Sequence, residues 1–345
     1  MSRLAVVLFN LGGPDSLEAV EPFLYNLFAD PAIIALPGPV RRLVARLVAH
    51  RRAPVARHIY ARMGNSSPIV ANTEIQARAL ETKLGEDTRA FVAMRYWAPF
   101  TQDAAQAVLA WKAEEIVLLP LYPQFSSTTT GSSLVTWREV AERIGLRVPT
   151  RTICCYPADD GFVTALARRL DTALAEWPEG VPVRILLSAH GLPQRIVARG
   201  DPYQTQVEQT AAAVRARVAR DVEMIVCYQS RVGPLKWLEP ATDAEIRRAG
   251  AERVGLIVLP IAFVSEHSET LVELDLDYGR LAAEAGVPRY VRAPTVSADA
   301  AFIAGLAELV QGARRRQSLI GPGGKGIACN AADRLCPCAA RGTGS

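Results

Sequence analysis

Short apolar segments alternate with longer alanine-rich segments along most of this chain, and this alternation constrains the fold more than any other feature. The apolar segments are hydrophobic at nearly every position, as in strands buried on both faces. The segments between them have the spacing of amphipathic helices. We therefore expect an α/β fold with parallel sheets covered by helices. The expected strands are 4–10, 90–95, 116–121, 150–154, 183–188, 224–228 and 256–263, with helices at 73–84, 103–113, 161–174, 203–218 and 298–311.

Two of the expected strands resemble each other in sequence. EIVLLPL at 115–121 and GLIVLPI at 255–261 are each followed by a loop rich in serine and threonine. This internal similarity indicates two related α/β halves with a cleft between them. We expect an N-terminal domain at 1–150, a C-terminal domain at 151–318 and a glycine-rich tail at 319–345.

The composition excludes several classes of protein. The chain has 345 residues, of which 50% are hydrophobic and 21% charged, and its net charge is +4. These values are typical of a globular protein, and the small net charge argues against nucleic-acid binding. No apolar stretch reaches membrane-spanning length, and an expected strand from Leu4 leaves no room for a signal peptide. We expect a cytoplasmic protein, and the sequence leaves open whether it is a monomer or a homodimer.

A row of acidic residues follows the apolar run 254–264. Glu269, Glu273 and Asp277 are spaced four apart, so a helix would place all three carboxylates on one stripe, with His267 at its head. Such a stripe suits a path for a metal cation or for protons. The alternative is a solvated acidic face close to a helix N-terminus, where acidic side chains favour the helix dipole.

His190 favours the first interpretation. It follows the apolar run 183–187 in the segment Ser188-Ala189-His190-Gly191-Leu192-Pro193. Ligands of open α/β sheets bind at the carboxyl ends of strands, and His190 and His267 each come just after such an end. We therefore expect the two histidines to share one site with the acidic row.

Further motifs occur along the chain in a fixed order, and each is quoted as it stands: Asn10-Leu11-Gly12-Gly13-Pro14, Arg51-Arg52, Ser67-Pro68-Ile69, Met94-Arg95-Tyr96, Tyr122-Pro123-Gln124-Phe125-Ser126, Thr130-Gly131-Ser132-Ser133, Arg199-Gly200-Asp201-Pro202-Tyr203 and Gln229-Ser230-Arg231-Val232-Gly233-Pro234 with Trp237. With the two histidine segments, they make the chain similar to the ferrochelatases from Leu8 to about Gln311. These enzymes insert Fe(II) into protoporphyrin IX, the last step of haem biosynthesis.

The resemblance implies a fold and a set of site residues. It implies two Rossmann-like domains with the porphyrin in the cleft, and His190 as the central catalytic residue that takes pyrrole protons or helps to deliver the metal. His267 and Glu269, with Glu273 and Asp277 behind them, would form the opposing wall. The implied porphyrin-binding residues are Leu11, Arg51, Arg52, Tyr60, Ser67, Arg95, Tyr96, Ser132 and Trp237. Some relatives carry methionine where this chain has Leu11, which cannot ligate a metal.

Three cysteines of the tail have no evident packing purpose. Disulfides are unusual in the cytosol, and the paired C-x-x-C spacing that zinc prefers is absent. The resemblance implies a 2Fe–2S cluster held by Cys329, Cys336 and Cys338 with one internal cysteine. The animal enzymes take that ligand from a position that is Ser127 here, so Cys155 or Cys154 would replace it, with Cys155 slightly preferred. The alternative is a disordered tail with free thiols.

Alternatives to this function also remain. They are a chelatase for coproporphyrin III or for cobalt, and a non-catalytic haem or iron sensor. The apolar stretches 22–28 and 33–37 are either ordinary helix core or, by resemblance, a hydrophobic lip that touches a membrane. A membrane contact would suit an apolar substrate such as protoporphyrin.

Overall fold

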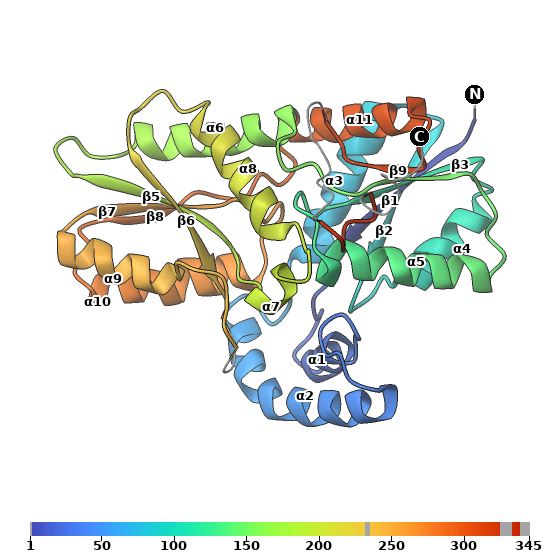
Figure 1. The fold of residues 1–345 in the computed structure, drawn as a ribbon, viewed down its shortest axis with the longest axis horizontal. Coiled ribbons are helices and arrows are strands. Elements are labelled where there is room, and N and C mark those ends of the chain that lie inside the picture. The colour runs from blue at the N-terminus through green and yellow to red at the C-terminus, as the bar shows by residue number, and fades with distance from the viewer. Residues whose placement is uncertain (1, 232–234, 325–332, 339–345) are drawn as a thin grey trace. The chain divides into compact units, whose positions relative to one another are not determined.

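The computed structural model describes residues 2–231, 235–324 and 333–338 (Figure 1). Packing divides the chain into two compact units, Met1–Cys155 with Ala307–Pro322, and Tyr156–Leu306 with Gly323–Ser345. Each unit contains one parallel sheet, so the expected α/β fold with two related halves is confirmed. The units are defined by packing alone, so the boundaries expected at 150 and 318 remain predictions about independently folding domains.

The first unit is built on a five-stranded parallel sheet of order β2-β1-β3-β4-β9. Central strand β1 is completely buried, which explains its uninterrupted apolar sequence. One face of the sheet packs on α4 and α5 through Phe9, Val108 and Trp137. The strands are β1 (Leu4–Asn10), β2 (Thr88–Met94), β3 (Glu115–Pro120), β4 (Thr150–Ile153) and β9 (Ile320–Gly321), and the helices are α1 (Val20–Phe28), α2 (Gly38–Ala61), α3 (Ile69–Leu84), α4 (Thr101–Ala110), the π-helix η1 (Ser127–Gly131) and α5 (Ser132–Arg143).

The second unit has a four-stranded parallel sheet of order β6-β5-β7-β8. Its central strand β5 pairs with β6 on one side and with β7 on the other. The strands are β5 (Val183–His190), β6 (Glu223–Gln229), β7 (Gly255–Pro260) and β8 (Tyr290–Arg292), and the helices are α6 (Asp160–Ala175), α7 (Gln194–Val197), α8 (Tyr203–Arg215), α9 (Thr242–Glu252), the π-helix η2 (Glu269–Asp277) and α10 (Tyr278–Glu284). Helix α11 (Ala300–Arg315) begins in this unit and ends in the first.

The sequence similarity between 115–121 and 255–261 corresponds to equivalent places in the two sheets. Strand β3 pairs with the first strand of its unit, as β7 does with β5. A π-helix follows each of these two strands. All seven expected strands are present, whereas β8 and β9 were not expected because three and two residues give no periodic signal.

The acidic row lies on a π-helix, not on the α-helix that its spacing suggested. A π-helix closes its hydrogen bonds over five residues instead of four, so its turn is wider. Residues four apart then no longer fall on one line. Glu269, Glu273 and Asp277 are consequently displaced around the helix, which changes the neighbours that each of them can reach.

Candidate active site

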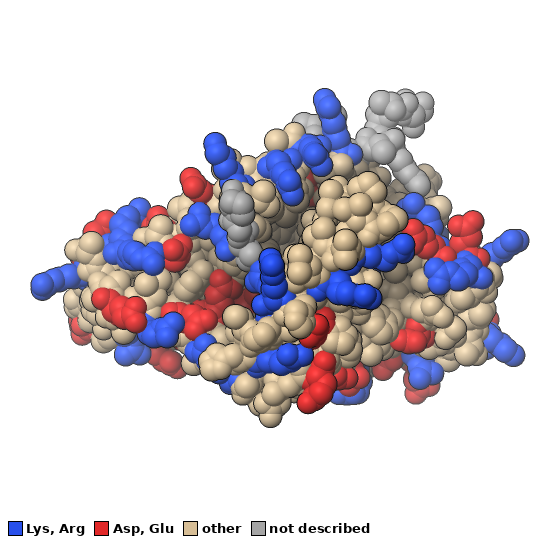
Figure 2. All heavy atoms as spheres, turned by 90° about the horizontal axis from the view of Figure 1, so that it is seen from below, with Lys and Arg blue, Asp and Glu red and all other residues tan. Residues whose placement is uncertain are grey.

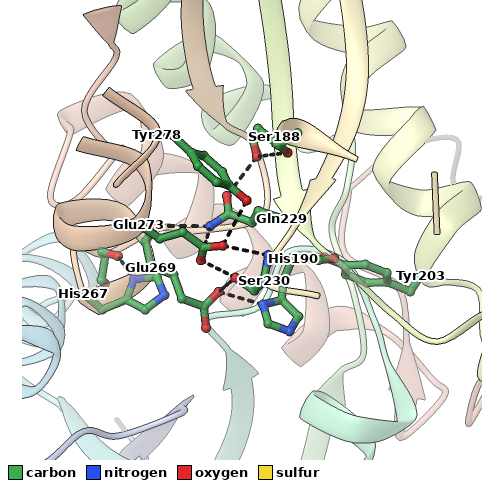
Figure 3. A network of polar contacts seen from close by, with 11 residues as sticks. Ser188, His190, Tyr203, Gln229, Ser230, His267, Glu269, Glu273 and Tyr278 are labelled. Carbon is green, nitrogen blue, oxygen red and sulfur yellow. Dashed lines mark hydrogen bonds and ion pairs between the residues drawn. The ribbon is translucent and has the colours of Figure 1, made fainter. Parts of the chain in front are cut away.

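The carboxyl ends of β5 and β6 bring the first site residues together. His190 is the last residue of β5 and pairs directly with Gln229, the last residue of β6. The acidic π-helix η2 follows β7, which lies on the other side of β5. Figure 3 shows the side chains of these three segments converging on one polar network. The geometry of the second unit therefore brings His190 next to the acidic segment, where it contacts Glu269.

Tight backbone packing fixes the position of His190. The N–H of Gly191 donates to the carbonyl of Gln229 at 2.8 Å. A Cβ at Gly191 would lie 2.8 Å from that oxygen and 3.3 Å from the Trp237 ring, so only glycine fits here. The hydroxyl of Tyr203 donates to the carbonyl of His190 at 3.0 Å. Contacts of Gly191 with Gln229 and of Tyr203 with His190 thus hold the backbone at His190 in place.

His190 forms an ion pair with Glu269. Its Nδ1 donates to Oε2 of Glu269 at 2.7 Å, and the two side chains are 41% and 23% exposed. Within the described ranges, no protein atom hydrogen-bonds to Nε2. When the ring is neutral, Nδ1 therefore keeps the proton that it donates to Glu269, and Nε2 presents a lone pair to a substrate.

Glu273 lies in the same network and accepts several hydrogen bonds. Its carboxylate accepts hydrogen bonds from the Ser230 N–H at 2.8 Å, from the Gln229 amide at 3.1 Å and from the Tyr278 hydroxyl at 3.1 Å. The hydroxyl of Ser230 also donates to Glu273 and, at 3.3 Å, lies within reach of Glu269. Ser230 adopts a left-handed φ of 61°, a strained conformation that is concentrated at functional sites.

His190, Glu269 and Glu273 shift the pKa values of one another in different directions. Burial raises the pKa of Glu269, but the charge and hydrogen bond of His190 outweigh burial and lower this pKa to about 2. Burial lowers the pKa of His190, but the charge of Glu269, its hydrogen bond and the charge of Glu273 together outweigh burial, and the net shift is upward. Burial and the charge of Glu269 raise the pKa of Glu273. One carboxylate is thus held ionised while its neighbour has a greater tendency to hold a proton.

The remaining residues of the expected polar wall lie at different places. His267 is 7% exposed, and its Nδ1 donates to the carbonyl of Ser265 at 3.0 Å. Its charge contributes to the lowered pKa of Glu269. Asp277 forms an ion pair with Arg280 at 4.0 Å. The structure therefore brings Glu269 and Glu273 into one network, whereas Asp277, the last residue of η2, pairs with Arg280 on α10.

In the first unit, three of the expected porphyrin-binding residues surround one carboxylate. Asp30, which is 4% exposed, accepts from Arg95 at 2.8 Å, from the Tyr96 hydroxyl at 2.7 Å and from Ser132. The Nε of Arg95 donates to Ser132 at 2.7 Å. In the described part of the chain, Nη1 of Arg95 has no hydrogen-bonding partner. Asp30 thus orients a guanidinium that keeps one nitrogen available for an anion.

The other expected porphyrin-binding residues are more dispersed. Leu11 and Tyr60 belong to the cluster in which α1 packs on α2. Ser67 lies against Gly13, whose hypothetical Cβ would be 2.5 Å from the Ser67 hydroxyl. Arg51 and Arg52 are exposed on α2, with Arg52 stacked over Phe28 at 5.9 Å. In the second unit, Trp237 forms an isolated antiparallel β-bridge with Pro193. Its buried indole N–H has no hydrogen-bonding partner among the described residues.

Four residues of these networks had no role in the sequence-based prediction: Asp30, Gln229, Ser230 and Tyr278. Gln229 and Ser230 were quoted only as part of a family motif. Their position at the end of an expected strand beside that of His190 was the available signal. Asp30 carried no such signal, because it becomes a site residue only through contacts with residues 65 and 102 positions away.

The expected cluster cysteines are only partly described. Cys329 lies outside the described residues. Cys336 is buried, and its sulfur lies within 4.8 Å of that of Cys338. Cys154 and Cys155 are both buried directly after β4, with their sulfur atoms 3.8 Å apart. The segment around Cys336 is anchored by the N–H of Leu335, which donates to the carbonyl of Gly200 at 3.1 Å.

Replacing Glu269 by glutamine is expected to lower the pKa of His190, because the variant removes the negative charge that opposes burial. The measurement is an NMR titration of the His190 Cε1–H resonance in the metal-free protein. Glu208→Gln, which changes an exposed carboxylate on α8, is the matched control and should leave the titration unchanged. An unchanged or raised pKa in Glu269→Gln would contradict the assigned ion pair.

Comparison with known proteins identifies the fold and the family of the chain. SirB from Bacillus subtilis, solved with Fe3+, aligns with a TM-score of 0.52 at 13% identity, covering 91% of this chain and 96% of SirB, which shows a shared chelatase-type, Rossmann-like fold. Ferrochelatase of Phenylobacterium zucineum is 51% identical over 99% of both chains. Ferrochelatase of Caulobacter vibrioides is 48% identical over 97% of both. Residues 3–314 match the ferrochelatase family as a whole, and the chain belongs to that family.

Proposed function

We infer that this protein is a ferrochelatase, a lyase that inserts Fe(II) into protoporphyrin IX and forms protohaem. Its membership of the family supports this activity. The observation that supports the mechanism is the His190–Glu269 pair, joined to Glu273 by Ser230. This network combines a proton acceptor with carboxylates that can hold a hydrated divalent cation.

The reaction exchanges two pyrrole protons for one Fe2+, so charge is conserved when both protons leave. Neutral His190 accepts a proton at Nε2, and the imidazolium that forms is stabilised by ionised Glu269. Glu273, with its raised pKa, is the next group able to take a proton. Because the pairing with Glu269 helps to raise the pKa of His190, the neutral form that accepts the proton becomes abundant only at higher pH than for an unpaired histidine.

The first unit contributes to porphyrin binding through Arg95. Its side chain is 18% exposed and its guanidinium is held by Asp30 and Ser132, so little side-chain freedom remains to be lost when a propionate binds. A guanidinium pairs well with a carboxylate. Asp30 also fixes Tyr96 and Ser132, and we propose these residues as the support of the propionate site. Leu11, Arg51, Arg52, Tyr60, Ser67 and Trp237 remain proposed porphyrin contacts.

His190→Ala is expected to lower the rate of metallation by about a hundredfold or more, the usual contribution of a positioned proton acceptor. Porphyrin binding and the melting temperature should change little, because the backbone at this position is held by Gly191 and Tyr203. The assay mixes purified protein with Fe(II) and protoporphyrin IX without oxygen. His58→Ala, at an exposed position of α2, is the control. Near-normal turnover in His190→Ala would exclude this residue as the acceptor.

The same assay separates the competing functions. A haem or iron sensor would bind protoporphyrin without turnover, and a coproporphyrin or cobalt chelatase would prefer coproporphyrin III or Co(II). We propose protoporphyrin IX because exposed aliphatic side chains of α2 provide an apolar surface suited to a substrate that partitions into lipid. These side chains are Val40, Leu43, Leu47 and Val55.

We also propose that Cys329, Cys336 and Cys338 hold a 2Fe–2S cluster together with Cys154. Four thiolates are the usual ligand set of such a cluster. The N–H of Cys154 donates to the carbonyl of Gly321 at 3.0 Å, so the chain that leads into the tail departs beside Cys154. This backbone contact favours Cys154 over Cys155 as the internal ligand. The cluster would attach the tail to the folded unit at this strand end.

Protein purified without oxygen is expected to absorb visible light without added haem and to contain about two irons and two sulfides per chain. Cys154→Ser should abolish this absorbance, whereas Cys155→Ser, the matched variant at the adjacent buried position, should retain it. If Cys155→Ser alone loses the absorbance, the internal ligand is Cys155. If the wild type is colourless and free of iron, the protein holds no cluster.

Helix α2 is the element that we propose to contact a membrane. Small residues face its packed side at Ala45, Ala49 and Ala53, whereas Leu43 is 71% and Val55 67% exposed. No acidic residue occurs among its 24 residues, which include Arg41, Arg42, Arg46, Arg51, Arg52 and Arg57. Figure 2, which views the molecule from below Figure 1, shows a face on which many basic side chains stand beside uncharged surface, with acidic side chains among them.

This pattern suits the anionic cytoplasmic leaflet of a membrane. None of the described helices has the length and apolar character to cross a bilayer. We therefore propose that the protein lies in the cytoplasm and associates peripherally with the membrane through α2. The aliphatic side chains would enter the headgroup region while the arginines meet anionic lipids.

The variant Leu43→Asp/Leu47→Asp is expected to abolish co-sedimentation with phosphatidylglycerol vesicles. Arg42→Gln/Arg46→Gln should weaken binding by about 1 kcal/mol per arginine. Leu109→Asp, at a 43% exposed leucine of α4, is the control. Membrane contact through α2 is excluded if Leu43→Asp/Leu47→Asp binds as the wild type does, or if Leu109→Asp loses binding equally.

A further inference from the structure

Arg292, the last residue of β8, connects the two sides of the acidic segment. Its side chain is only 9% exposed. Its Nε and Nη2 donate to the two oxygens of Asp275 at 2.7 and 2.6 Å, and its Nη1 donates to Glu266 at 2.7 Å. A guanidinium that grips one carboxylate with two parallel hydrogen bonds fixes both its distance and its orientation.

The two partners of Arg292 flank the acids of the site in the sequence. Glu266 precedes the π-helix η2, and Asp275 lies within it, so Glu269 and Glu273 fall between the two anchored positions. Glu266 is further held by the Thr295 N–H, which donates to the same oxygen at 2.9 Å. Arg292 on β8 thus holds both ends of the stretch that supplies the acids. Thr295, which follows β8, adds a second contact at the Glu266 end.

A π-helix needs such attachment. Its hydrogen-bonding pattern is rare and occurs mostly as short pieces inside other helices, so tertiary contacts must select it over an α-helix. A change to α-helical winding would rotate Glu269 and Glu273 relative to each other. The distance of 2.7 Å between His190 and Glu269 therefore depends on how the segment is held.

We propose that Arg292 is a positioning residue for metal insertion: by binding Glu266 and Asp275 together, it keeps the π-helix η2 in the winding that places Glu269 and Glu273 against His190 and Ser230. Arg292 itself takes no part in the contacts of the His190 network. The proposal rests on the chelatase activity inferred above. The burial of Arg292 and its three charged hydrogen bonds distinguish it from a surface ion pair, which contributes little to stability.

Arg184 is a matched control in the same sheet. It lies on β5, is 6% exposed and also joins two carboxylates, with Nε 2.6 Å from Glu223 and Nη2 2.5 Å from Glu252. Arg184 is near the beginning of β5, whereas His190 is the residue at the end of that strand. Replacing Arg184 therefore removes a comparable ion pair without a direct effect on the segment that carries the acids.

The test compares Arg292→Gln, Arg292→Lys and Arg184→Gln in steady-state metallation of protoporphyrin IX and in thermal melting. We expect both glutamine variants to lower the melting temperature. Arg292→Gln should lower kcat about tenfold or more, since small displacements of catalytic groups have effects of this size, while KM for porphyrin changes less than about twofold. Arg292→Lys, which keeps the charge but not the paired hydrogen bonds, should recover part of kcat. Arg184→Gln should keep its kcat.

A double variant distinguishes positioning from general destabilisation. Asp275→Asn alone should lower kcat, and Arg292→Gln/Asp275→Asn should be no slower than Arg292→Gln, because both changes break the same contact. If Arg292→Gln does not fold, Asp275→Asn, at a side chain that is 32% exposed, decides the question. Wild-type kcat in folded Arg292→Gln or in Asp275→Asn overturns the proposal, as does an equal loss in Arg184→Gln. An inactive wild type would overturn the inferred chelatase activity instead.

Discussion

The ion pair between His190 and Glu269 is the interaction on which the rest of the site depends. It exists because three parallel strands end at one edge of the sheet, with His190 on β5, Gln229 beside it on β6 and Glu269 after β7. The close packing of Gly191 against the carbonyl of Gln229 holds this edge together. A side chain at position 191 would displace the backbone that carries His190, and the pair would lose its geometry.

The same pair explains how two carboxylates can lie in one network. Two ionised carboxylates in one network repel each other, so each needs a positive charge or hydrogen-bond donors to stabilise its negative charge. His190 supplies it for Glu269, whose pKa falls to about 2, and Glu273 instead accepts hydrogen bonds from Ser230, Gln229 and Tyr278. The carboxylates are therefore inequivalent, as transfer of protons away from a substrate requires. Both carboxylates lie on the π-helix that Arg292 holds, and its wide turn sets their positions relative to each other.

Asp30 has an analogous part in the first unit. One buried carboxylate fixes a guanidinium, a phenol and a hydroxyl, so the orientation of Arg95 is set before a substrate binds. Asp30 lies just beyond α1, which packs on α2, and thereby links the proposed membrane-contacting helix to the proposed propionate site. In both units, a side chain proposed to meet the substrate is oriented by a neighbouring carboxylate, His190 by Glu269 and Arg95 by Asp30.

The sequence by itself determined the α/β class, the seven longer strands, the similarity of the two halves and the convergence of His190 with the acidic segment. These features follow from local signals, because buried parallel strands are continuously apolar and their carboxyl ends form binding edges. The short strands β8 and β9, the roles of Asp30, Ser230 and Arg292, and the attachment of residues 307–322 to the first unit were decided by tertiary structure. Each depends on contacts between residues distant in sequence, which periodicity does not encode. The π-helix belongs with them: a spacing of four fits an α-helix locally, and the wider turn occurs in a segment that Arg292 holds through Glu266 and Asp275.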